Sequence, residues 1–246
     1  MRILVTNDDG ISAEGLKALA DLLSEDNEIF VLAPDGNRSG FSHSLTIHRD
    51  LFLKEEKLSD RYPSRSLSGT PADCVKFAFH RFGEPPFDLV CSGINHGLNL
   101  GSDTTYSGTV SAGLEANYFG VPAVAFSNVA KEGYLFGENA KVIRRLFPAL
   151  QKLLSPRYTL NVNLPNLPLE KISGARCAKL GVQQYTDEYI LCENGGYRLI
   201  GDPVVEEGRE ETDVTLSRKN FVTVTPVLYD RTDLSVVGRM EGKDLL

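Results

Sequence analysis

Short apolar runs alternate with amphipathic stretches through the first two thirds of the chain. Apolar residues at intervals of three and four, as at Leu16, Leu19 and Leu23, predict helices, with others expected from Thr70 to Phe82, over about 109–119 and over about 138–154. The runs between them are typical of buried strands and lie at residues 3–5, 29–33, 87–91, 123–127 and 159–163. This alternation predicts an α/β fold with a mostly parallel sheet covered by helices on both faces.

The pattern changes after the proline-rich segment 165–168. Short alternating stretches at 197–200 and 221–225 are separated by acidic or glycine-rich turns, which indicates hairpins rather than further strand–helix–strand units. We therefore expect one domain over residues 1–246, with an α/β core at 1–168. A β-rich extension at 169–246 is expected to serve subunit association.

Composition and charge narrow the functional classes. With 41% hydrophobic and 24% charged residues, the chain has the composition of an ordinary globular protein. A formal net charge of −7 argues against binding to nucleic-acid polymers, which needs clustered Lys and Arg. An anionic substrate would therefore need positive charge supplied locally, by a metal ion, a helix N-terminus or a few placed cations.

Other segments bear on location and on the cysteines. No apolar run approaches the ~18 residues of a membrane span, and the chain reaches Asp8 and Asp9 without a signal-peptide region. We therefore expect a cytoplasmic protein that does not bind membranes. Four scattered cysteines show no metal-ligand spacing and are expected to be free and buried: Cys74, Cys91, Cys177 and Cys192.

Oxygen donors follow three of the predicted strands, at Thr6–Gly10, Asn37–Ser39 and Ser92–Gly97. Ligands of an open parallel sheet bind outside the carboxyl ends of its strands. Asp8 and Asp9 repel each other unless a cation lies beside them, and oxygen ligands favour Mg²⁺, Mn²⁺ or Ca²⁺ over zinc. The alternative is that Asp8 caps the following helix and Asp9 shapes a turn.

A second cluster, Tyr106–Ser111, directly precedes an apolar helical pattern. Free N–H groups at a helix N-terminus attract phosphate, so this segment is a candidate anion site without net charge. The alternative is ordinary Ser/Thr capping. The glycines nearby match neither the dinucleotide-binding pattern nor the P-loop, so hydride transfer and ATP hydrolysis lose their main support.

Two further side chains adjoin these segments. His96 could orient a leaving group or a metal ligand, or could simply be satisfied by backbone groups. Arg38 could contact a phosphate, or could be an ordinary exposed arginine. The sequence alone leaves both questions open.

Five motifs in series make the chain recognisable: ILVTNDDG at 3–10, APDGNRSG at 33–40, SGTPADCV at 68–75, SGINHGLNLG at 92–101 and YSGTVSAG at 106–113. Their order and spacing resemble the SurE family, the survival protein E or stationary-phase survival nucleotidases. The resemblance covers essentially the whole α/β half. It departs from the family pattern at Ala112–Gly113, where we expect Ala-Ala.

The resemblance implies a metal-dependent 5′-nucleotidase. Members hydrolyse nucleoside 5′-monophosphates, often 3′-monophosphates and sometimes short polyphosphate. It also implies a Rossmann-like three-layer core whose C-terminal β-extension is exchanged between subunits, giving a homodimer or homotetramer. Carried over by motif, the ligands of Mg²⁺ or Mn²⁺, with Ca²⁺ as a further occupant, are Asp8, Asp9, Ser39 and Asn95.

In the resulting hypothesis, Asp8 and Asp9 hold the metal and one of them also acts as general base. Substrate phosphate then contacts Asn95, Ser107, Gly108 and Thr109. A zinc deacetylase is disfavoured because no histidine stands beside the acidic pair. A phosphatase with a phosphoaspartyl intermediate and a non-enzymatic nucleotide sensor on the same fold remain alternatives.

Overall fold

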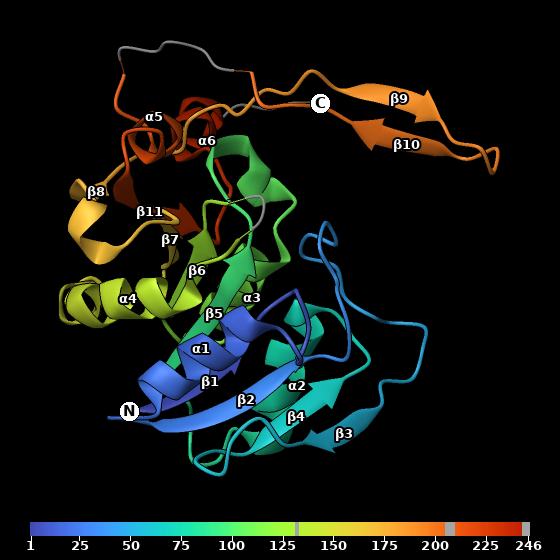
Figure 1. Cartoon of the computed structure of the whole chain (residues 1–246), viewed down its shortest axis with the longest axis vertical. Coiled ribbons are helices and arrows are strands. Elements are labelled where there is room, and N and C mark those ends of the chain that lie inside the picture. The colour runs from blue at the N-terminus through green and yellow to red at the C-terminus, as the bar shows by residue number, and fades with distance from the viewer. Residues whose placement is uncertain (131–132, 205–209, 243–246) are drawn as a thin grey trace.

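The computed structural model describes residues 1–130, 133–204 and 210–242 (Figure 1). Within these residues, nine strands form one sheet. In spatial order they are β3 (Leu53–Glu56), β4 (Ser64–Leu67), β2 (Glu28–Pro34), β1 (Arg2–Thr6), β5 (Leu89–His96), β6 (Ala123–Asn128), β7 (Tyr158–Leu164), β11 (Phe221–Leu228) and β8 (Gly174–Cys177). Neighbours run parallel except for β3 against β4 and β7 against β11, so the predicted mostly parallel sheet is confirmed.

Helices cover both faces of this sheet, as the strand–helix alternation predicts. One face packs against α1 (Glu14–Leu23) and α4 (Phe136–Gln151), and the other against α2 (Pro71–Phe82) and α3 (Gly108–Tyr118). The remaining helical segments are η1 (Gly101–Thr105), η2 (Leu169–Lys171), α5 (Asp213–Ser217) and α6 (Leu234–Met240). Across the described parts of the chain, no helix has the length and apolar character needed to cross a bilayer.

The starts of the two helices on the α2–α3 face follow from local chemistry. The Thr70 hydroxyl accepts from the Asp73 N–H at 3.1 Å, and the Asp73 carboxylate accepts from the Thr70 N–H at 2.9 Å. This reciprocal cap, with Pro71 in the first turn, satisfies two N–H groups that a helix start leaves unpaired. Helix α2 therefore begins where the Thr-Pro pair predicts.

Helix α3 is buried on nearly every side, which selects small residues along it. A Cβ added at Gly113 would lie 2.5 Å from Cγ2 of Thr159, on β7. An alanine at position 113, as in the Ala-Ala pattern, would therefore overlap the Thr159 side chain. Glycine here leaves the space that the threonine fills.

The C-terminal part divides between the sheet and a projecting arm. Residues 197–200 form β10 (Tyr197–Ile200), which pairs with β9 (Glu188–Leu191) as the predicted hairpin. Residues 221–225 lie within β11, which instead joins the main sheet between β7 and β8. The hairpin interpretation of that segment is wrong. Its buried apolar side chains pack into the main hydrophobic core beside β7.

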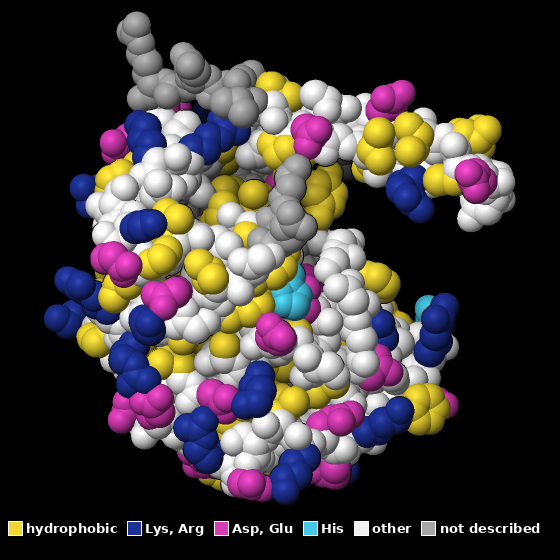
Figure 2. Space-filling view, in the orientation of Figure 1, with side chains coloured by type: hydrophobic (Ala, Val, Ile, Leu, Met, Phe, Trp, Pro, Cys, Tyr) yellow, Lys and Arg dark blue, Asp and Glu magenta, His cyan; other side chains and the backbone are white. Residues whose placement is uncertain are grey.

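The β9–β10 hairpin projects from the body as an arm (Figure 1). Residues directly opposite each other in an antiparallel pair share a face, and here they pair Tyr197 with Leu191 and Leu199 with Tyr189. All four side chains are more than half exposed, at 72, 66, 52 and 69% in that order. Figure 2 shows apolar side chains gathered on this arm.

The cysteines do not all follow the expectation. Cys74 and Cys91 are buried within the core, as expected for small apolar side chains. Cys177 is exposed on the edge strand β8, and Cys192 is half-buried beside the turn of the arm, so burial was wrongly predicted for these two. All four thiols are free.

Candidate metal and phosphate site

The carboxyl ends of β1, β2 and β5 lie side by side, because β1 pairs with both of the others. The Arg38 N–H donates to the Asp8 carbonyl at 2.7 Å, and the His96 N–H donates to Asp9 Oδ2 at 2.9 Å. The loops after all three strands are thereby joined. They bring to one edge of the sheet the predicted oxygen donors Asp8, Asp9, Ser39 and Asn95.

Asp8 is a buried carboxylate in a closely fitted setting. It is 3% exposed, and its Oδ1 accepts a hydrogen bond from the Thr109 hydroxyl. A Cβ on Gly108 would come within 2.8 Å of the Asp8 Cβ, so the glycine allows the helix start to approach. Burial is the main cause that raises the pKa of Asp8 to about 6; the Thr109 bond lowers it and the Asp9 charge adds to the rise. A cation would stabilise this carboxylate as an anion.

The capping interpretation of Asp8 is wrong. Helix α1 has Ala13 at its N-cap position and no side-chain cap. The Asp8 carboxylate instead receives the Thr109 hydroxyl, from the start of α3. Asp8 therefore connects the first strand to the segment that the sequence marks as an anion site.

Both carboxylate oxygens of Asp9 contact His96. Besides the bond to Oδ2, the His96 Nδ1 lies 3.3 Å from Asp9 Oδ1. Burial raises the pKa of Asp9, and the interactions with His96 oppose that rise. The His96 ring packs against Tyr134 and Phe136, with centroids 4.8 and 5.1 Å away. Of the roles left open for His96, the contacts favour orienting Asp9.

The other two donors are neutral. Asn95 is 8% exposed, and its Nδ2 donates to the Gly97 carbonyl at 3.0 Å, which fixes the amide group. Ser39 is exposed on the loop after β2, and its N–H donates to Asn37 Oδ1 at 2.9 Å. Asn95 is thus held rigidly, whereas the position of Ser39 depends on its loop.

The start of α3 both caps itself and faces the acidic pair. The Ser107 hydroxyl accepts from the Val110 N–H at 3.1 Å, so the capping interpretation of Ser107 is confirmed. The Thr109 hydroxyl and N–H both interact with the Asp8 carboxylate and lower its pKa. The positive end of the helix thus points at Asp8, where an oxyanion would also be favoured.

The donor set fits a hard divalent cation. Among the described residues, no three His, Cys, Asp or Glu side chains lie close enough to hold a metal. The candidate ligands are instead two carboxylates, a hydroxyl and an amide. These oxygen donors suit Mg²⁺, Mn²⁺ or Ca²⁺ and not zinc. The Arg38 guanidinium is engaged with Asp35 at 2.7 Å, so this cation is neutralised within its own loop.

A group of buried polar residues holds the loop after β5, and the sequence interpretation missed it. The Asn99 carbonyl accepts from Nδ2 of Asn161 at 2.7 Å and of Asn163 at 3.0 Å. The Gly101 N–H donates to Asp213 Oδ2 at 2.8 Å. Alternating asparagines in the otherwise apolar run 159–163 were the available signal for this role.

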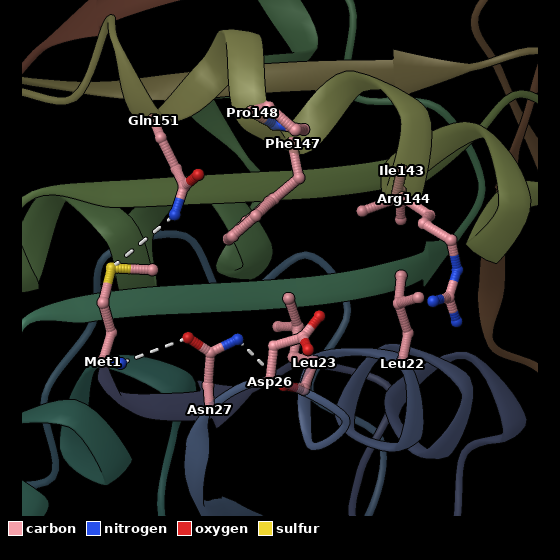
Figure 3. Close-up of a pocket in the computed structure, with 10 residues that line it drawn as sticks. All are labelled: Met1, Leu22, Leu23, Asp26, Asn27, Ile143, Arg144, Phe147, Pro148 and Gln151. Carbon is pink, nitrogen blue, oxygen red and sulfur yellow. Dashed lines mark hydrogen bonds between the residues drawn. The ribbon is translucent and has the colours of Figure 1, made fainter.

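Two hollows differ in their distance from the acidic pair. One of about 770 Å³ is lined by Asp103, Tyr106 and Tyr185, among others, and Tyr106 directly precedes Ser107 in the chain. The other, of about 360 Å³, lies between α1 and α4 next to Met1 (Figure 3). Met1 precedes β1 and Asp8 follows it, so the second hollow is at the opposite end of the strand.

Comparisons with known proteins agree with the motif resemblance. The family model described as "Survival protein SurE" matches residues 3–187. The chain is 40% identical to the 5′-nucleotidase SurE of Rubrobacter xylanophilus, over 100% of this chain and 98% of that protein. It is 39% identical to the protein of the same description from Carboxydothermus hydrogenoformans, over 98 and 95% of the two chains. The crystal structure of the SurE protein from Aquifex aeolicus superposes with a TM-score of 0.83 at 34% identity, covering 98% of both chains.

Proposed function

The chain belongs to the SurE family, and from that premise we propose that it is a metal-dependent 5′-nucleotidase. It would hydrolyse nucleoside 5′-monophosphates to a nucleoside and phosphate. The observation that carries the proposal is the convergence of Asp8 and Asp9 with the start of α3. Relatives described as 5′-nucleotidases match over the whole length of the chain.

We assign the metal to Asp8, Asp9, Ser39 and Asn95. These oxygens suit Mg²⁺ or Mn²⁺, with Ca²⁺ as a further occupant. When bound, the cation supplies charge neutralisation and Lewis-acid activation of water and phosphate. The net charge of −7 then presents no obstacle, because the substrate is neutralised locally.

The chain's own groups bind and orient the phosphate. The start of α3, at Ser107, Gly108 and Thr109, offers the positive end of the helix dipole, and Asn95 offers its amide at the end of β5. These dipoles are fixed before the substrate arrives, so charge that develops on the phosphoryl oxygens is stabilised without reorganisation. Asp8 or Asp9 accepts the proton of the attacking water.

We place the nucleoside in the hollow on the Tyr106 side of this phosphate position. The hollow of about 770 Å³ that includes Tyr106 offers both aromatic and polar lining. Its openness to solvent is consistent with a range of monophosphates, so we extend the proposal to 3′-monophosphates and short polyphosphate. Assays with several nucleoside monophosphates measure which base is preferred.

We further propose that residues 169–246 act as an extension for assembly into a homodimer or homotetramer. The support is the arm. Its four-residue apolar face is more than half exposed, so no other part of the described chain buries it as core residues are buried. Exposed apolar surface of this kind marks an interaction site. A second copy of the chain is the partner that the family relationship suggests.

A panel of nucleoside monophosphates assayed with Mg²⁺, Mn²⁺, Ca²⁺ and EDTA tests the activity. We expect phosphate release that requires a divalent cation and falls to background in EDTA. A nucleotide sensor would instead bind AMP in calorimetry without releasing phosphate under any cation. An acid-labile phosphoenzyme would favour the phosphoaspartyl alternative. Either result would contradict the proposed mechanism.

A further inference from the structure

The loop after β2 carries Ser39 and has neither helix nor strand over residues 35–52. Its shape therefore depends on contacts with other elements. One contact is already at the site, where the Arg38 N–H donates to the Asp8 carbonyl at 2.7 Å. Ser39 follows directly, so the next contacts along the loop decide how firmly its hydroxyl is held.

Ser42 ties the loop to the chain just before the phosphate-binding turn. Its N–H donates to the Tyr106 carbonyl at 3.2 Å, and its hydroxyl donates to the Thr105 carbonyl at 2.7 Å. These partners immediately precede Ser107, the N-cap of α3. The loop therefore bridges the metal-ligand side and the phosphate side of the site.

The far end of the loop is fixed to the start of α2. The Thr46 N–H donates to Asp73 Oδ1 at 3.0 Å, and the Thr70 hydroxyl donates to the Ser44 carbonyl at 2.7 Å. Thr70 and Asp73 are the pair that caps α2. This anchor uses groups that the helix start already orders, so it holds residues 44–46 independently of the site.

Between these anchors, His43 reaches a buried charge. Its Nε2 lies 2.9 Å from Oε2 of Glu115 on α3, and the Lys76 Nζ lies 2.7 Å from the other oxygen. Glu115 is only 5% exposed. Burial raises its pKa, but the hydrogen bonds from His43 and Lys76 outweigh this and the net shift is downward. The imidazole can donate from Nε2 whether neutral or protonated.

We propose that His43 is a positioning residue for Ser39, acting through its bond to Glu115. The loop between the Arg38 contact and His43 is short, so fixing both ends fixes the serine between them. Breaking the bond also leaves Glu115 with one partner for a buried charge, which makes this anchor stronger than an exposed ion pair. The inference rests on the proposed metal site and adds a residue that the family motifs did not single out.

Mn²⁺ binding by calorimetry tests the proposal without relying on turnover. We expect His43→Ala to weaken Mn²⁺ binding about tenfold. Removing a residue that positions a metal ligand typically lowers metal affinity by roughly 10- to 100-fold, and this is the lower end of that range. Hydrolysis should recover towards the parent kcat at saturating Mn²⁺. His43→Gln, which retains an N–H donor, should restore most of the affinity. His48→Gln changes an exposed histidine of the same loop and should match the parent.

A double-mutant cycle separates positioning from general stabilisation. Glu115→Gln should weaken Mn²⁺ binding in the same direction, and its combination with His43→Ala should be no worse than the more affected single variant. Unchanged Mn²⁺ affinity in folded His43→Ala, or in folded Glu115→Gln should the alanine variant not fold, would overturn the inference. A parent that binds no Mn²⁺ would overturn the proposed metal site, and the inference with it.

Discussion

The strand ends around Asp8 and the β9–β10 arm break the usual distribution of side chains in opposite ways. Asp8 is a carboxylate that is 3% exposed, whereas Tyr197 is a large aromatic residue that is 72% exposed. A buried charge and an exposed apolar face are the two departures from the usual distribution that call for an explanation. Each therefore supports one part of the proposed function.

The two regions differ in the kind of partner that would stabilise them. At the strand ends, positive charge would stabilise the two carboxylates, because burial raises the pKa of both acidic residues. Along the arm, contact with another apolar surface would remove these side chains from water, because one whole face of the hairpin is exposed. The proposed cation would stabilise the carboxylates, and the proposed second copy of the chain would cover the apolar face of the arm.

The largest expected effect is at Asp8. Asp8→Asn should lower AMP hydrolysis at least about 1000-fold, because metal assistance is worth several kcal/mol and each 1.4 kcal/mol is tenfold. The metal-free variant should melt no lower than the parent, since the change removes a buried charge. Asp60→Asn, at an exposed carboxylate, is the control. Retained hydrolysis in Asp8→Asn would show that the buried pair is not the catalytic centre.

The next effect tests how closely the site is fitted. Gly108→Ala introduces a Cβ that would lie 2.8 Å from the Asp8 Cβ, which is closer than two carbon atoms can pack. Displacing a catalytic group by about 1 Å costs up to about 100-fold in rate, so we expect a loss of that order. Kinetics with Mn²⁺ and circular dichroism would distinguish this from unfolding. Full activity would mean that α3 can move away from Asp8 without consequence.

A smaller effect is expected at the arm. Replacing the directly opposed pair Leu191 and Tyr197 by serine should reduce the mass in solution towards the 27.0 kDa of one chain. Light scattering after size-exclusion chromatography measures this. Arg198→Ser, on the opposite face of the hairpin, is the matched control. An unchanged mass would show that the apolar face does not join subunits.

The smallest effect concerns packing behind the site. Gly113→Ala should cost about 1–3 kcal/mol through overpacking against Thr159. The melting temperature should therefore fall by roughly 2–10 °C. Adding Thr159→Ala should restore part of it. Gly137→Ala, in α4 with no atom near the added Cβ, should not lower the melting temperature. A stable Gly113→Ala variant would contradict the packing argument.

The sequence predicted the central strands better than the edges. The runs that became β1, β2, β5, β6 and β7 are apolar because both of their faces are covered. The edge pair β3 and β4 was not predicted, since Lys54, Glu55 and Glu56 occupy most of β3 and solvent covers one side of it. The pairing of β11 was not predictable, because its pattern is local and its partners are far away in the chain.

The site was partly predictable for a similar reason. Asp8 and Asp9 come just after β1 and Asn95 lies at the end of β5, so the general geometry of parallel sheets brings them together. The bond between His43 and Glu115 joins positions 72 residues apart, and no local pattern indicates it. The same holds for Asp213, which contacts Gly101 across 112 residues. Contacts of this kind depend on the tertiary fold.

That last contact has a consequence for synthesis of the chain. The loop after β5 is held by Asn161 and Asn163 and then by the carboxylate of Asp213. A ribosome delivers these groups in order, so Asp213 is synthesised only after the whole α/β core. We expect the nascent protein to acquire its α/β frame first and the full set of contacts behind the candidate site only once Asp213 has emerged, so chains that stop before Asp213 would remain inactive.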